Sequence, residues 1–273
     1  MIHLRLLGGA SLEDESGPLA GPAAQRHRIA LLALLAASPA RGLAREKVMA
    51  LLWPERDTEN ARKLLNQSVY VLRKTLGEDS IRSPGEELRL SSGRIRCDLV
   101  AFERALAGDD LERAVELYTG PFLDGFHLDA APAFERWQAA QRARLDRAYG
   151  KALETLADAA ERRGAIRRAV EWWAVRARQD PYDSRVALRL MHALASSGNP
   201  AGALRHAAEH ERLLREELGI EPVAEIRALT ERLRRESVGE ARRDGEETVV
   251  DPGPPRIRAK AEVAGSSDVG FHA

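Results

Sequence analysis

The feature that most constrains the fold is an internal repeat in the second half of the chain. Residues 161–170 (ERRGAIRRAV) match residues 195–204 (ASSGNPAGAL), and their glycines, Gly164 and Gly198, lie about 34 residues apart. This period, with a small residue ending one helix and an alanine-rich helix following, is typical of repeats built from helix pairs. Residues 108–115 (GDDLERAV) are a third, more distant copy. Such pairs stack to bury a shared core and leave concave surfaces for partners.

The region from residue 101 to residue 236 is expected to be all-helical and tetratricopeptide-like. It shows no strand-like alternation, and Gly-Pro, Asn-Pro and Asp-Pro pairs separate stretches in which apolar residues recur at helical spacing. The predicted helices cover residues 102–107, 111–118, 134–163, 166–179, 184–196, 201–218 and 223–235. From residue 237 the sequence becomes polar, and the proline-rich segment 251–255 cannot lie inside a helix. We therefore predict that residues 237–273 form a disordered tail.

Residues 1–100 have a different pattern, which predicts an α+β domain. Residues 2–6 alternate between apolar and polar and predict a strand, and a second strand is expected to begin at Leu12. Residues 88–90 and 95–97 flank a Ser/Gly turn, which predicts a β-hairpin. Three helices are predicted between these strands from apolar residues at helical spacing, over 25–37, 45–53 and 58–76. Together these elements make a winged helix, so the fold class is mainly α with an N-terminal α+β winged helix.

The third of these helices, residues 58–76, carries the sharpest candidate site. Thr58 is expected to cap its N-terminus, and Gly77 is expected to end it. Between residues 60 and 76 its polar face has four basic residues and no acidic residue. The candidates on this face are Arg62, Lys63, Asn66, Gln67, Tyr70, Arg73 and Lys74.

These side-chain types suit a DNA duplex. A major groove admits one helix, in which Asn and Gln pair with adenine and Arg and Lys pair with guanine. Base reading is expected from Arg62, Asn66 and Gln67, and phosphate contacts, which position a protein without reading sequence, from Tyr70, Arg73 and Lys74. The alternative is the solvated face of an ordinary amphipathic helix.

The predicted hairpin adds a second group of basic residues. Arg89, Arg94 and Arg96 are expected on its exposed side, where they would contact the DNA backbone or the minor groove. Exposed hairpins also carry charge merely to prevent edge-to-edge pairing, and the sequence leaves both interpretations open.

Five stretches of the chain, taken in order, resemble one known family. They are 31–35 (LLALL), 48–54 (VMALLWP), 69–77 (VYVLRKTLG), 114–123 (AVELYTGPFL) and 213–222 (LLREELGIEP). This succession resembles the SARP-type antibiotic regulatory activators over roughly residues 1–236. The family pairs a DNA-binding domain, similar to the response-regulator winged helix, with a bacterial transcriptional activation domain (BTAD). The resemblance is to the short members of the family, in which no ATPase domain is expected after these two.

The resemblance implies a function and a set of partners. Related activators bind direct repeats in double-stranded promoter DNA as dimers and recruit RNA polymerase, so a homodimer on DNA is expected. In the related response-regulator fold the loop between the second and third helices, here 54–59, faces the transcription machinery. Glu55, Arg56 and Asp57 lie in this loop. The alternative is a plain solvated turn.

Composition places few further limits on function. Lys and Arg number 42, as do Asp and Glu, so the chain lacks the overall basic excess typical of nucleic-acid binders. Cys97 is the one cysteine, which excludes an internal disulfide and agrees with a reducing cytoplasm. We see no secretion signal and no apolar stretch long enough for a membrane span. The expected location is the cytoplasm, associated with the nucleoid, with no membrane contact.

Two alternatives to a DNA-binding activator remain. The near-neutral charge favours a tetratricopeptide-like scaffold whose winged helix does not bind DNA, although the acid-free third helix argues against it. His206, Glu209 and His210 match the His-x-x-Glu-His pattern of a zinc hydrolase. No third ligand follows this motif in the sequence, and no other catalytic grouping stands out. We therefore expect no enzyme activity, no cofactor and no metal.

Overall fold

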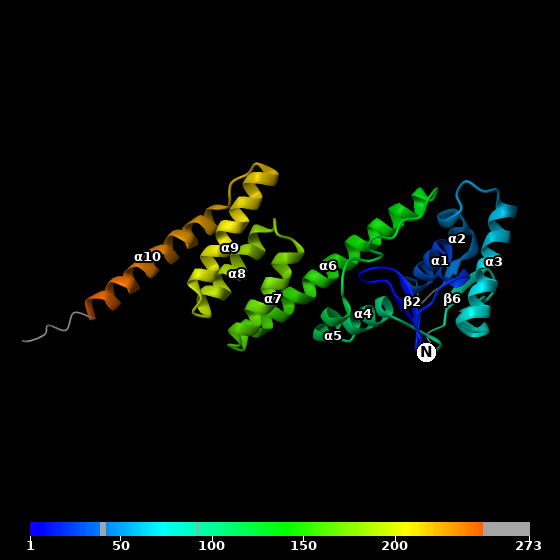
Figure 1. Cartoon of the computed structure of the whole chain (residues 1–273), viewed down its shortest axis with the longest axis horizontal. Helices are drawn as coiled ribbons and strands as arrows, with labels where there is room; N and C mark the ends of the chain where they lie inside the picture. The colour runs from blue at the N-terminus through cyan, green and yellow to red at the C-terminus, as the bar shows by residue number, and fades with distance from the viewer. Residues whose placement is uncertain (39–41, 92, 248–273) are drawn as a thin grey trace, which may run out of the picture.

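The computed structural model describes residues 1–38, 42–91 and 93–247, the last ten of these as backbone only. The molecule is elongated, with an α+β region at one end and helices stacked toward the other (Figure 1). This arrangement confirms the predicted fold class. The predicted disordered tail falls largely outside the described residues.

The N-terminal region begins with a four-stranded sheet. β1 lies in its interior, antiparallel to β2 and parallel to β7, with Ile2 opposite Ile95. Leu4 and Leu12 point into the core from adjacent strands, as the alternating pattern predicts. The strands, in the order in which they lie, are β3 (Gly17–Pro18), β2 (Ser11–Asp14), β1 (Ile2–Arg5) and β7 (Ile95–Cys97).

Three helices follow, close to their predicted positions. The first, α1, is the central one, because every residue from Arg28 to Ala36 is buried. Both other helices contact it, and Ala44 caps the second without a side-chain hydrogen bond, as expected of alanine. Their bounds are α1 (Arg26–Ala36), α2 (Arg45–Leu52) and α3 (Thr58–Leu76).

The wing is built from different strands than the sequence predicted. A three-stranded sheet contains β4 (Leu43–Ala44), β6 (Glu87–Leu90) and β5 (Ile81–Arg82), in that order. Both edges of β6 are therefore occupied, so β7 pairs with β1 in the other sheet. The predicted hairpin between 88–90 and 95–97 is wrong. The hairpin is β5–β6, and residues 83–86 form its tip.

The helical region agrees with the predicted repeats. Gly164 and Gly198 both adopt positive φ, 73° and 80°, where the chain turns between helices. Glycine enters this conformation without the cost that a side chain imposes, which explains its recurrence in the repeat. The helices are α4 (Asp98–Ala107), α5 (Leu111–Leu117), α6 (Pro132–Arg162), α7 (Ile166–Gln179), α8 (Ser184–Ser196), α9 (Pro200–Leu213), a π-helical turn (Leu214–Leu218) and α10 (Ala224–Glu247).

The last helix is longer than predicted. α10 continues past residue 236 to Glu247, although the tail was expected to begin at residue 237. Residues 237–247 are polar but rich in Glu and Arg, whose helix propensity outweighs the cost of two glycines. Polarity was therefore a poor sign of where the helix ends.

The hydrophobic core does not divide at residue 100. One cluster of buried side chains includes Leu4 and Leu31 together with Phe122 and Leu145, which lie beyond that position. The domain boundary there remains a prediction. Two smaller clusters join α6 to α8 and α8 to α10. Of the helices that the structure describes, none is both long and apolar enough to cross a membrane.

Two tryptophans of the helical region, Trp173 and Trp137, pack against other segments of the chain. Trp173 is 1% exposed, and its indole N–H donates to Glu161 Oε1 at 2.8 Å. The Arg189 guanidinium lies over the Trp173 ring, 4.8 Å from its centroid, and Arg189 also pairs with Glu161. Trp137 of α6 packs edge-on against Phe122, which precedes this helix, with 5.8 Å between ring centroids.

Candidate nucleic-acid interface

The amphipathic pattern of α3 determines which of its faces is exposed. Asp57, rather than Thr58, caps the helix: its Oδ1 accepts a hydrogen bond from the Asn60 backbone N–H at 2.9 Å. The predicted N-cap was therefore one residue too late, because two residues at this start can cap a helix. The buried stripe, on the side opposite the predicted polar face, consists of Ala61, Leu65, Ser68, Val69, Leu72 and Leu76.

The opposite face of α3 is polar and accessible. Tyr70 is 62% exposed, the largest exposed fraction among the large hydrophobic side chains that the structure describes. Lys63 pairs with Glu59 one turn earlier, at 2.8 Å, and both side chains remain largely exposed. The exposed residues among the predicted DNA contacts on this helix are Arg62, Lys63, Asn66, Gln67, Tyr70 and Lys74.

Asn66 is oriented by a residue that sequence reasoning missed. The Arg45 guanidinium, at the start of α2, donates a hydrogen bond to Asn66 Oδ1 on α3. The Nδ2 group of Asn66 is thereby directed away from Arg45, as a donor that could reach a purine N7. Arg45 begins a predicted helix, but only the packing of α2 beside α3 brings it to Asn66.

Arg73 differs from the other predicted contacts. Its side chain is partly buried, and Nε donates to the backbone carbonyl of Ile81 at 2.9 Å. Its Nη2 donates to Ser83 Oγ at 2.8 Å. These bonds attach the end of α3 to the first strand and the tip of the wing. Arg73 therefore positions the wing relative to the helix.

The three predicted wing arginines do not lie together. Arg89 is on β6, within the hairpin, and pairs with Glu87 at 2.8 Å. Arg96 is on β7, opposite His3 of β1, and therefore belongs to the other sheet. Arg94 is exposed in the turn before β7. The hairpin contains Arg82 instead, exposed on β5 opposite Arg89, which the sequence analysis did not single out.

The second histidine of the His-x-x-Glu-His motif has a structural role. His210 is 1% exposed, and its Nδ1 lies 2.9 Å from the Pro181 carbonyl oxygen, so Nδ1 carries the proton. Its Nε2 accepts from the Ser184 hydroxyl at 2.9 Å. Glu209 pairs with Arg212. Within the described part of the chain, no three His, Cys, Asp or Glu side chains are grouped so that they could hold a metal ion.

The comparisons with known proteins agree with this architecture. No curated protein shows significant sequence similarity to the chain. The structure is similar to that of Mycobacterium tuberculosis EmbR in complex with a low affinity phosphopeptide, with 23% sequence identity and a TM-score of 0.58. The likeness covers 92% of this chain and 71% of that one.

The sequence itself identifies the family. Residues 97–234, about half of the chain, match the bacterial transcriptional activator domain. This match includes the helical repeats and begins at the end of β7. Family and fold are those of a transcriptional regulator, which confirms the resemblance to SARP-type activators. The chain belongs to the family of bacterial transcriptional activator domain proteins.

Proposed function

We propose that the protein is a sequence-specific DNA-binding transcriptional activator that binds promoter repeats and recruits RNA polymerase. The observation that carries this proposal is the exposed face of α3. It has basic and amide side chains, and no acidic residue between Asn60 and Leu76. A surface helix without a DNA partner has no need to exclude acidic residues, whereas a helix in a major groove must avoid repulsion by phosphates.

The proposed DNA contacts are of two kinds: some side chains read bases, and others hold phosphates and so position the protein. Arg62, Asn66 and Gln67 lie one turn or one residue apart on α3 and are the proposed base contacts. Lys63, Tyr70 and Lys74 flank them and would hold phosphates. Arg82 and Arg89 of the β5–β6 hairpin add a second backbone contact beside α3.

The proposed polymerase contact is the loop between α2 and α3. Asp57 is committed to capping α3, as its bond to Asn60 shows. Glu55 and Arg56 remain exposed, and they supply the free side chains of this loop. Two copies bound side by side on direct repeats would present two such loops and two sets of helical repeats.

The test is a titration of labelled DNA with the full chain, followed by fluorescence anisotropy at two salt concentrations. The probes are a fragment from upstream of the protein's own gene and a random fragment. We expect preference for the first, and loss of affinity as salt rises. Asn66→Ala/Gln67→Ala should abolish the preference.

A control variant removes two basic side chains from the helical repeats. Lys151→Ala/Arg205→Ala changes two exposed basic residues outside the winged helix and should bind like the native protein. The proposal would be contradicted if the native protein and both variants bound the two fragments weakly and without preference for either. Such a result would favour the scaffold alternative, in which residues 101–236 bind a protein partner.

A further inference from the structure

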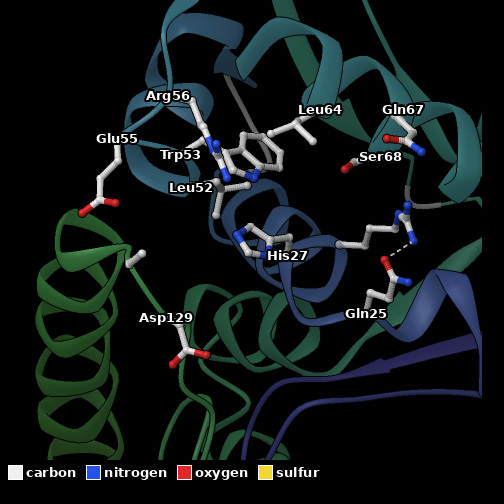
Figure 2. A pocket seen from close by; sticks show the side chains of 12 residues that line it. Gln25, His27, Leu52, Trp53, Glu55, Arg56, Leu64, Gln67, Ser68 and Asp129 are labelled. Atoms are coloured by element: carbon white, nitrogen blue, oxygen red, sulfur yellow. Dashed lines mark hydrogen bonds between the residues drawn. The ribbon is translucent and has the colours of Figure 1, made fainter. Parts of the chain in front are cut away.

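A cavity of about 480 Å³ opens between α1, the α2–α3 loop, α3 and the segment that precedes α6. Figure 2 shows its lining: Gln25, Ser68 and Gln67 lie at one end, and Glu55 and Asp129 lie at the other. The volume falls within the range of pockets that bind small molecules. Because Asp129 lies in the helical region, between α5 and α6, the winged helix alone does not complete this cavity.

Arg28 lines the cavity and is a buried cation without an anionic partner. It is 8% exposed, and Nη1 donates to the Pro22 carbonyl at 2.5 Å and to Gln25 Oε1 at 2.7 Å. Its buried Nε has no hydrogen-bond acceptor among the residues that the structure describes. Those same residues place no carboxylate within ion-pair distance of its guanidinium. Buried charges in proteins are normally paired, since isolation from water is costly.

The middle of the cavity is flat and aromatic. His27 stacks on Trp53 with 5.5 Å between ring centroids and 5° between ring planes. Leu52 and Leu64 add apolar surface from α2 and α3. Burial lowers the pKa of His27, which keeps this ring neutral at physiological pH. A planar apolar group would therefore replace water here at little cost.

We propose that this cavity binds a small planar organic acid, whose acidic group pairs with Arg28 and whose flat body lies against the His27–Trp53 pair. The anion supplies the charge that the protein does not provide. A DNA phosphate fits less well, because Arg28 is almost entirely buried.

The test measures binding to the full chain by calorimetry, with indole-3-carboxylate, its neutral analogue indole-3-carboxamide and inorganic phosphate as probes. The carboxylate should bind saturably and at least about tenfold more tightly than the carboxamide, because only the acid pairs with Arg28. Phosphate should bind weakly, since it offers no flat body. A short random-sequence duplex should not displace the carboxylate.

Three variants separate the site from other surfaces. Arg28→Gln should weaken carboxylate binding by about tenfold or more. Leu64→Trp fills the cavity without altering Arg28 and should abolish binding, which decides the question even if Arg28→Gln fails to fold. Arg26→Gln is the matched control, because Arg26 is exposed on the same helical turn and bonds to His127 outside the cavity.

Equal affinity for acid and amide, unchanged affinity in folded Arg28→Gln, or no saturable binding of any probe would overturn the proposal. Competitive displacement by the duplex would also overturn it, since the anion would then stand for a DNA phosphate. The outcomes for the acid, the amide and the Arg28→Gln variant do not depend on whether α3 reads a promoter, whereas displacement by a duplex does, because Gln67 belongs to both surfaces.

Discussion

Asp98 accepts a hydrogen bond from the backbone N–H of Leu6, with 2.9 Å between the nitrogen and Oδ1. The same carboxylate accepts from the N–H groups of Leu7 and Leu99. Leu6 follows the first strand, whereas Asp98 begins α4, the first helix of the matched activator domain. One side chain therefore joins the start of the chain to the start of the helical region.

Asp98→Ala is expected to destabilise the protein. The substitution leaves the N–H groups of Leu6 and Leu7 without their acceptor, at a cost of about 1–3 kcal/mol in the free energy of unfolding. Urea denaturation followed by circular dichroism measures this change. Asp124→Ala is the control, since Asp124 is exposed, and it should change stability by about 0.5 kcal/mol or less. Equal urea midpoints for the two variants would contradict the role given to Asp98.

Arg73 and Lys74 are adjacent basic residues with different expected effects. Arg73→Ala removes the bonds to Ile81 and Ser83 and should lower the free energy of unfolding by about 1–2 kcal/mol. Lys74→Ala, at an exposed position, should leave stability unchanged while weakening DNA binding. Thermal unfolding and DNA titration of both variants distinguish the two roles. If the Arg73→Ala variant unfolds at the same temperature as the native protein, the Arg73 side chain does not hold the wing.

Arg45 and Asn66 should act as one unit in DNA reading. Asn66→Ala is expected to cost about 1–3 kcal/mol of specific binding. Arg45→Ala should cost a similar amount because it leaves the Asn66 amide free to rotate. The double variant should lose less than the sum of the two single losses. Strict additivity in the DNA titrations would show that the contact does not orient Asn66.

The strand pairing predicts which arginines contact DNA. Arg82→Ala/Arg89→Ala removes two charges from the β5–β6 hairpin, so the salt dependence of binding should become shallower by about two phosphate contacts. Arg96→Ala should have no effect, because Arg96 lies on β7 in the other sheet. Anisotropy titrations at several salt concentrations provide the slopes. If Arg96→Ala changed the slope more than Arg82→Ala/Arg89→Ala, the β5–β6 hairpin would not be the part of the wing that contacts DNA.

His27 should make stability depend on pH. Burial lowers its pKa below the usual 6.5, so the folded state favours the neutral ring. Its contribution to stability is complete above about pH 6.5 and is lost as the pH falls through the folded pKa, because the unfolded chain then binds the extra proton. His27→Phe keeps an aromatic ring against Trp53 but has no group that binds a proton in this range. The variant should therefore lose less stability than the native protein between about pH 7.5 and pH 5.5.

Part of that pH dependence should remain in the His27→Phe variant. Burial also lowers the pKa of His206, which lies far from α1 in the helical repeats. The urea midpoint of His27→Phe should therefore still fall with pH, but less than that of the native protein. An identical fall in both proteins would mean that His27 does not contribute.

Periodicity was sufficient to predict the interface helix. The stripe from Ala61 to Leu76 follows from apolar residues at helical spacing, and its burial leaves the polar face outside. The glycines at the ends of the repeats were equally visible, because each marks a turn with positive φ. Both are local features, so neighbouring residues in the sequence determine them.

Contacts between distant segments could not be predicted in the same way. The sequence shows that 95–97 is a strand but not that β4 already occupies the edge of β6. Likewise, the bond between Arg45 and Asn66 depends on how α2 packs beside α3. The cavity beside Arg28 requires three separate segments of the chain to meet.

The length of α6 has a consequence for how two copies would sit on DNA. This helix has 31 residues, or roughly 46 Å, and its side chains enter both the core of the winged helix and that of the first repeats. If α3 binds DNA as proposed, this helix would act as a rigid spacer that carries the rotational phase of the duplex to the repeats. Two bound copies should therefore align only when their sites are separated by whole helical turns, and half a turn of inserted DNA would place their repeats on opposite sides of the duplex.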